Sequence, residues 1–349
     1  MTAVVTGAAG HVGANLVRAL LAAGKPVRAV VRDDTRGVEG LPLELIRGDM
    51  LDPASLLAAF EGAEVVFHLA SVITVAGDPT GIVRRTNVEG ARNVAEACLA
   101  ALVRRLVHFS SIHAFDARPR DEIIDESRPR AEEGGGQPIY DRTKAAGERE
   151  ILAAVERGLD AVIVNPTAVL GPFDFKPSRM GRVIRMLATG TMPALVGGGF
   201  DWVDARDVTA GALAAAERGR TGERYLLSGR WTTFTELARI VATCSGTRLP
   251  RFTSPMWLAR LGAPFVSAFS RLRGTEPLYT GESLHALRNH RRISSARASA
   301  ELDYAPRPLE QTIADTVSWF DKHEGPGEKK PRSGEAFRTG AGRGPGRGT

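Results

Sequence analysis

A tyrosine and a lysine stand four residues apart in the middle of the chain, and a glycine-rich segment stands near its start. Tyr140 and Lys144 occur in YDRTK, and the N-terminal segment is VVTGAAGHVG. Four residues are about one helical turn, so a helix here presents the phenol and the ammonium on one face. A nearby ammonium lowers the pKa of a phenol from about 10, which helps the tyrosine exchange a proton with a carbonyl or an alcohol. The pair therefore predicts acid–base chemistry at an oxygen atom.

The glycine-rich segment predicts a binding site for a dinucleotide. Gly7, Gly10 and Gly13 follow a short apolar run and precede a helical pattern, which is the context required of a phosphate-binding loop. The glycines permit a tight turn, a close approach of backbone amides to the pyrophosphate, and close packing of helix on strand. His11 and Val12 belong to the same loop, where the backbone amide of His11 is expected to matter more than its ring. Together with the tyrosine and lysine, the loop indicates hydride chemistry on a nicotinamide cofactor.

The end of the second predicted strand bears on the choice between NADP and NAD. A carboxylate at this point usually holds the ribose 2′-hydroxyl of NAD, but the residues here are Val31, Arg32 and Asp33. The guanidinium of Arg32 offers a fork of donors that suits a 2′-phosphate. We therefore expect NADP, and NAD remains the less favoured alternative because a small shift of the turn would bring Asp33 to the ribose.

Further residues are expected along the cofactor. Asp49 and Met50 follow the third strand, where an adenine ring would lie, although Asp49 also fits a helix-capping role. The fourth strand ends in small or apolar residues where the dinucleotide must pass close to the backbone, namely Leu69, Ala70 and Ser71. Asn87 either caps the next helix or helps to order the active site, and the residues leave both interpretations open.

Short apolar runs alternate with helical patterns through the first half, which predicts an α/β fold with a Rossmann-type, doubly wound parallel sheet. The predicted strands are 3–5, 27–31, 43–46, 65–69, 106–109 and 161–164. A dinucleotide-binding domain is expected over residues 1–171, with 202–229 returning to it. The remaining parts are a smaller, mostly helical substrate-binding region over 172–201 and 230–323, and a disordered basic tail over 324–349.

Composition excludes several classes of protein. A hydrophobic content of 43% and a charged content of 25% are ordinary for a soluble globular protein. Arg or Lys interrupts every apolar run before it is long enough to span a membrane, and no secretory signal is visible. A cytoplasmic protein is therefore expected. Most of the net charge of +6 lies in the tail, so no nucleic-acid partner is expected, and contact of the tail with nucleic acid or an anionic surface is the less favoured alternative. Cys98 and Cys244 predict reduced thiols, and the lack of a Cys/His cluster predicts no metal site.

The fifth predicted strand ends in Ser110 and Ser111, at the carboxyl edge where open α/β sheets bind ligands. Ser111 is placed to hydrogen-bond a substrate oxygen beside Tyr140. With this serine the order of motifs resembles an extended short-chain dehydrogenase/reductase over residues 1–323: TGAAGHVG, Gly48-Asp49, HLAS, TNVEGARNV, FSSIHAF, YDRTK and NPTAVLGP. The sequence is most similar to the dihydroflavonol reductase-like branch, which includes 3β-hydroxysteroid dehydrogenases and the hopanoid-associated sugar epimerases.

The resemblance implies roles for the residues that match its motifs. Tyr140 would be the general acid/base, Lys144 would lower its pKa and bind the nicotinamide ribose, and Ser111 would orient the substrate oxygen. Pro166 and Thr167 would border the nicotinamide. A homodimer through the helices at 86–102 and 140–156 is a further implication. Phe115 stands where many sugar-nucleotide members have a tyrosine.

The expected activity is the NADP(H)-dependent interconversion of a carbonyl and an alcohol. The main alternative is an epimerase or dehydratase of sugar nucleotides that retains its cofactor. Ile112 stands next to Ser111 in place of an acidic pair, which counts against dehydration. A non-catalytic dinucleotide sensor is the third hypothesis, and the presence of both Tyr140 and Lys144 counts against it. His113, two residues past Ser111, is expected to be structural or to line the pocket.

Overall fold

The structure is a computed structural model that describes residues 2–75, 77–132, 134, 136–250, 252–254 and 292–323. The stretch 255–291 of the expected substrate-binding region and the expected tail at 324–349 lie outside the described residues.

A seven-stranded sheet in the order β10-β6-β5-β4-β1-β2-β3 forms the larger layer, and its neighbouring strands pair in parallel. Val, Ile and Leu fill most of these strands, as expected where helices cover both faces of a sheet. Its strands are β1 (Ala3–Thr6), β2 (Val27–Val31), β3 (Glu44–Arg47), β4 (Val65–His68), β5 (Arg105–Phe109), β6 (Ala161–Pro166) and β10 (Arg224–Leu227).

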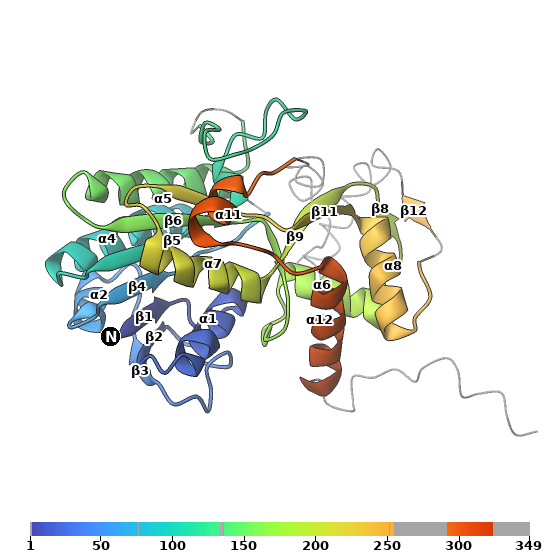
Figure 1. Cartoon of the computed structure of the whole chain (residues 1–349), viewed down its shortest axis with the longest axis horizontal. Helices are drawn as coiled ribbons and strands as arrows, with labels where there is room; N and C mark the ends of the chain where they lie inside the picture. The colour runs from blue at the N-terminus through green and yellow to red at the C-terminus, as the bar shows by residue number, and fades with distance from the viewer. Residues whose placement is uncertain are drawn as a thin grey trace, which may run out of the picture.

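Helices cover both faces of this sheet, as the left half of Figure 1 shows. One face carries α1 (His11–Ala22), α7 (Ala205–Arg218) and α11 (Ala296–Leu302), whose apolar side chains share one core with the strands. The other face carries α2 (Pro53–Phe60), α4 (Gly90–Ala100) and α5 (Ile139–Val155), which share a second core. The expectation of a doubly wound parallel sheet is therefore confirmed.

A smaller region packs beside the sheet, at the right of Figure 1, around an apolar core of its own. It holds a three-stranded sheet, β11-β9-β7, and a two-stranded sheet, β12-β8. Its strands are β7 (Ala168–Leu170), β8 (Leu195–Val196), β9 (Gly199–Asp204), β11 (Arg230–Thr233) and β12 (Thr253–Ser254). Its helices are α6 (Arg179–Ala188), α8 (Phe234–Ser245) and α12 (Leu309–His323).

The segment 202–229 was expected to return to the main sheet, and it does so only in part. Its second strand, β10, pairs with β6 in the main sheet, and α7 packs on the same sheet. Its first strand, β9, pairs instead with β7 and β11. The segment therefore joins the two regions, because its strands belong to different sheets.

Three short helices complete the described residues: α3 (Ile82–Arg84), the π-helical turn η1 (Arg85–Glu89) and the 3₁₀ turn η2 (Ile112–Ala114). None of the helices in the described ranges is both long and apolar enough to cross a membrane. The same residues contain no group of three or more His, Cys, Asp or Glu side chains placed to hold a metal ion.

Candidate active site

Ser111, Tyr140 and Lys144 meet where β5 ends. Tyr140 lies in the first turn of α5, and a hydrogen bond joins its side chain to that of Ser111. Ser111 lies two residues after the end of β5 and caps η2, since its hydroxyl oxygen accepts from the backbone N–H of His113 at 3.2 Å. One turn along α5, Nζ of Lys144 donates to the carbonyl oxygen of Phe109 at 2.7 Å. The geometry thus groups the three predicted catalytic residues at one strand end.

A cavity of about 470 Å³ runs from the glycine loop to these side chains. This volume is in the range of small-molecule and cofactor sites. Most of the predicted site residues line it, namely Gly7, Gly10, His11, Val12, Gly13, Leu69, Ser71, Ser111, Tyr140, Pro166 and Thr167. The hydroxyl group of Thr167 donates to the buried carboxylate of Asp201 at 2.7 Å, so it is already engaged at the cavity wall.

The glycine loop has the shape of a phosphate cradle. Gly7 has a φ of +68°, and a Cβ there would lie 2.7 Å from the backbone nitrogen of Ala70. A Cβ on Gly13 would lie 2.2 Å from the carbonyl oxygen of Gly7. The loop therefore presses against the residues that follow β4 and against the first turn of α1, which begins at His11. The first N–H groups of a helix have no partner within the helix and suit a phosphate. These residues fit a dinucleotide.

Five predicted residues do not line the cavity. Lys144 is buried behind it, and Ala70 packs under Gly7. Met50 is buried in the core beneath α4, while one carboxylate oxygen of Asp49 accepts from the N–H of Leu51 at 2.9 Å. Arg32 stands at the end of β2 with most of its side chain in solvent.

The expectation that Lys144 lowers the pKa of Tyr140 is wrong for this structure. Burial raises the pKa of Tyr140 to about 12, and the hydrogen bond with Ser111 opposes that rise only in part. Burial also lowers the pKa of Lys144 to about 8, since a buried ammonium loses its hydration. The ammonium of Lys144 is directed to the Phe109 carbonyl. The spacing in the sequence does not show this, because it fixes the shared helix face but not the burial of either group.

His113 and Asp141 form an ion pair beside the tyrosine. Nδ1 of His113 lies 3.0 Å from the Asp141 carboxylate, and the imidazole packs edge-on against the Tyr140 ring at 5.5 Å between centroids. Burial lowers the pKa of His113, but the carboxylate of Asp141 outweighs that effect and holds the pKa above its ordinary value. Both residues line the cavity. His113 was expected to be structural or to line the pocket, whereas Asp141, the residue next to Tyr140, was not among the predicted site residues.

Asn87 joins the catalytic helix to the loop after β4. Its amide group donates to the carbonyl oxygen of Val72 at 2.9 Å and to the hydroxyl of Thr143 at 3.2 Å, and its carbonyl accepts from the N–H of Val72. Because the helix begins earlier, at α3, Asn87 is not a capping residue. The structure favours the second interpretation, in which Asn87 orders the site.

A row of polar side chains lies under α5 on the main sheet. The hydroxyl of Thr6 is hydrogen-bonded to Nδ1 of His68 at 2.8 Å, and the His68 and His108 rings lie 5.2 Å apart on adjacent strands. Burial lowers the pKa of His68 to about 3 and that of His108 well below its ordinary value, and the Lys144 charge acts in the same direction. Both imidazoles are therefore neutral at physiological pH.

Several large apolar side chains line the cavity. They include the side chains of Ile73, Val75, Ile112, Met180, Phe200 and Ile293. Lys176 in the segment before α6 and Arg179 at the start of α6 add positive charge to the cavity wall, and Asp174 adds negative charge. The apolar side chains offer contact area for an apolar ligand.

Comparison with known proteins identifies the family. Residues 3–228 match the model of the NAD dependent epimerase/dehydratase family, and the chain belongs to this family. The expected resemblance, and the assignment as an NAD(P)-dependent enzyme acting on CH–OH groups, are confirmed.

The relatives extend over nearly the whole chain. It is 38% identical to sterol demethylase protein B of Methylococcus capsulatus, covering 92% of this chain and 98% of the relative. It is 33% identical to a putative dihydroflavonol 4-reductase of Synechocystis sp., covering 91% and 94%. The crystal structure of gox2253 superposes with a TM-score of 0.80 at 34% identity, covering 92% of this chain and 98% of that one.

Proposed function

We propose that the protein is an NADP(H)-dependent oxidoreductase that interconverts a carbonyl and an alcohol. The observation that carries the proposal is the hydrogen-bonded pair of Ser111 and Tyr140 in a cavity continuous with the glycine loop. The similarity to a putative dihydroflavonol 4-reductase supports it.

In the reductive direction, the glycine loop would hold the dinucleotide, which when bound would supply the hydride that the carbonyl carbon accepts. Tyr140 transfers its phenolic proton to the carbonyl oxygen, and the Ser111 hydroxyl stabilises the negative charge that develops there. The raised pKa of Tyr140 suits this direction, since the phenol is protonated at neutral pH. The Lys144 ammonium, which donates to the Phe109 carbonyl oxygen, supports the end of β5 near Ser111, and a proton from solvent restores the phenol.

The apolar side chains of the cavity wall support a largely apolar class of substrate. Ile73, Ile112, Met180 and Phe200 offer contact area but no charge for a polar ligand. A large, mostly apolar ketone or secondary alcohol would bury its surface there and leave its oxygen at Ser111 and Tyr140.

Replacement of Tyr140 tests the acid/base role. With a ketone identified from an apolar carbonyl panel, Tyr140→Phe is expected to lower kcat by about 10²- to 10⁴-fold and to leave NADPH affinity unchanged. Tyr225→Phe is the matched control, because this buried tyrosine donates to Glu301 at the edge of the sheet, away from the cavity. Unchanged turnover by Tyr140→Phe would remove the assignment.

An epimerase acting on sugar nucleotides is the second candidate. Lys176 and Arg179 favour it, because two cations beside the cavity suit a diphosphate. Release and identification of the nucleotide from purified protein distinguish the two functions. Tightly retained NAD together with turnover of a nucleotide sugar supports the epimerase, whereas exchangeable NADPH together with ketone reduction supports the oxidoreductase.

A further inference from the structure

Helix α5 carries a fully buried carboxylate, that of Glu148, which has no role in the reaction proposed above. Glu148 follows Lys144 by one helical turn, as Lys144 follows Tyr140, so the three side chains share one face of the helix. Its side chain is 0% exposed. A carboxylate is costly to bury unless it is paired and hydrogen-bonded. Glu148 accepts from Nε of Arg130 at 2.9 Å, and Arg224 lies 3.9 Å away.

Asn165 connects this carboxylate to the catalytic serine. Its side-chain nitrogen donates to Oε1 of Glu148 at 2.6 Å and to the backbone carbonyl oxygen of Ser111 at 3.0 Å. Asn165 is the penultimate residue of β6, a strand that is buried throughout, and is itself 0% exposed. A single amide therefore fixes the distance between the helix that carries Tyr140 and the residue that carries the hydroxyl group.

Glu148 also acts on the charge of Lys144. Burial lowers the pKa of Lys144, and the Glu148 carboxylate raises it. From the sheet side, His68 and His108 face the same ammonium, and both are neutral. Among these groups, Glu148 is the one that supplies negative charge.

We propose that Glu148 and Asn165 are positioning residues for the reaction, which rests on the function proposed above. Asn165 holds Ser111 in register with Tyr140, and Glu148 both anchors that amide and keeps Lys144 charged. The two residues are therefore expected to differ in their effects, since only Glu148 carries a charge.

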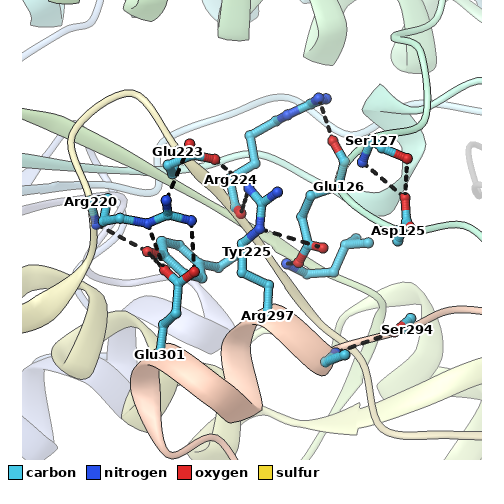
Figure 2. A network of polar contacts seen from close by, with 12 residues as sticks. Asp125, Glu126, Ser127, Arg220, Glu223, Arg224, Tyr225, Ser294, Arg297 and Glu301 are labelled. Carbon is cyan, nitrogen blue, oxygen red and sulfur yellow. Dashed lines mark hydrogen bonds and ion pairs between the residues drawn. The ribbon is translucent and has the colours of Figure 1, made fainter.

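The polar contacts continue away from the site and provide a control. Arg224 packs over the Phe115 ring and donates to the carbonyl oxygen of Glu126 at 2.7 Å. Figure 2 shows this arginine among the contacts that join Glu126 to Arg297 of α11. The carboxylate of Glu126 is buried and accepts from the N–H of Leu226 at 2.9 Å. Glu126→Gln thus removes a buried charge of the same network without touching Asn165 or Lys144.

The first experiment follows the Lys144 charge in Glu148→Gln. The lysine Cε signals of the ¹³C-labelled full-length protein are titrated, with Lys144→Met used to assign the signal. Lys144 is expected to deprotonate at lower pH in Glu148→Gln than in the wild type or in Glu126→Gln. The alkaline limit of ketone reduction is expected to move to lower pH with it. An unchanged titration overturns the role of Glu148, whether or not a substrate is known.

The second experiment measures kcat and KM of Asn165→Ala. We expect kcat to fall by about 10- to 100-fold, KM to change little, and the alkaline limit to stay in place because Glu148 keeps its charge. Unchanged kcat overturns the role of Asn165, and this variant decides the positioning of Ser111 even if Glu148→Gln does not fold. A wild type that reduces no carbonyl refutes the proposed function, whereas the lysine titration still decides the role of Glu148.

Discussion

Arg32 is the residue on which the choice of cofactor is expected to depend. Its side chain is 71% exposed, and its Nε lies 3.3 Å from the carboxylate of Asp33, whose side chain is 81% exposed. An ion pair as exposed as this contributes little to stability, so Arg32 is able to turn toward a 2′-phosphate at small cost. Arg36 is less available, because Asp34 binds it through two hydrogen bonds.

Arg32→Ala is accordingly expected to weaken NADPH binding and to leave NADH binding unchanged. Loss of a charged hydrogen bond costs about 1.5–3 kcal/mol, or roughly a 10- to 100-fold increase in Kd. Fluorescence titration with the two nucleotides measures the effect, and Arg36→Ala serves as the neighbouring control. A wild type that binds NADH more tightly than NADPH would assign this position to Asp33 and would contradict the proposal.

Single residues also show where the sequence is insufficient. Tyr140, Lys144 and Ser111 were found because their types and spacing are local properties. The raised pKa of Tyr140 was missed, because it follows from burial. The contacts of Asn165 with Glu148 and with Ser111 were missed for a related reason: they join residues 17 and 54 positions apart, which no local pattern reveals.

At the scale of elements, the approach of α1 to β1 depends on one missing side chain. A Cβ on Gly13 would collide with the Gly7 carbonyl and the backbone of Ala8. Gly13→Ala is therefore expected to destabilise the protein by about 1–3 kcal/mol and to weaken dinucleotide binding. Thermal unfolding and nucleotide titration measure both effects. Gly197→Ala is the control, because a Cβ at Gly197 has no atom within 4 Å, and equal behaviour of the two variants would contradict the packing argument.

The strands of the main sheet were predicted within one or two residues, since short apolar runs between helical patterns are a strong signal. β9 was assigned to the wrong sheet. Trp202 and Val203 are apolar and would fit a strand of either sheet. The pairing of Trp202 with Ala168 and Arg230 shows which sheet β9 belongs to, and the sequence does not reveal this pairing. The helix expected at 86–102 begins earlier, with a π-helical turn that places Asn87 against the catalytic helix.

For the molecule as a whole, the paired imidazoles predict loss of stability in acid. The pKa of His68 in the fold is about 3, below the 6.5 of the unfolded chain, so its contribution is complete above pH 6.5 and is lost as the pH falls toward 3. One such group costs about 2 kcal/mol between pH 6.5 and 5. His108 acts in the same direction, whereas His113, with its raised pKa, opposes them in part.

Urea unfolding at pH 7 and pH 5 measures this loss, and His68→Gln is expected to make the pH dependence shallower. A wild-type free energy of unfolding that is equal at the two pH values would contradict the prediction.

The position of these imidazoles, directly beneath the helix of Tyr140 and Lys144, also affects how kinetic profiles are interpreted. When His68 and His108 become protonated, the protein unfolds and the support of the catalytic helix is lost. The rate then falls although no group that touches substrate has been titrated. A decline of turnover on the acidic side then reports collapse of the scaffold. The two causes can be separated by brief exposure to acid followed by an assay at neutral pH. Unfolding leaves the enzyme inactive if the unfolded chains aggregate. Titration of a catalytic group is reversed at once, and full activity returns.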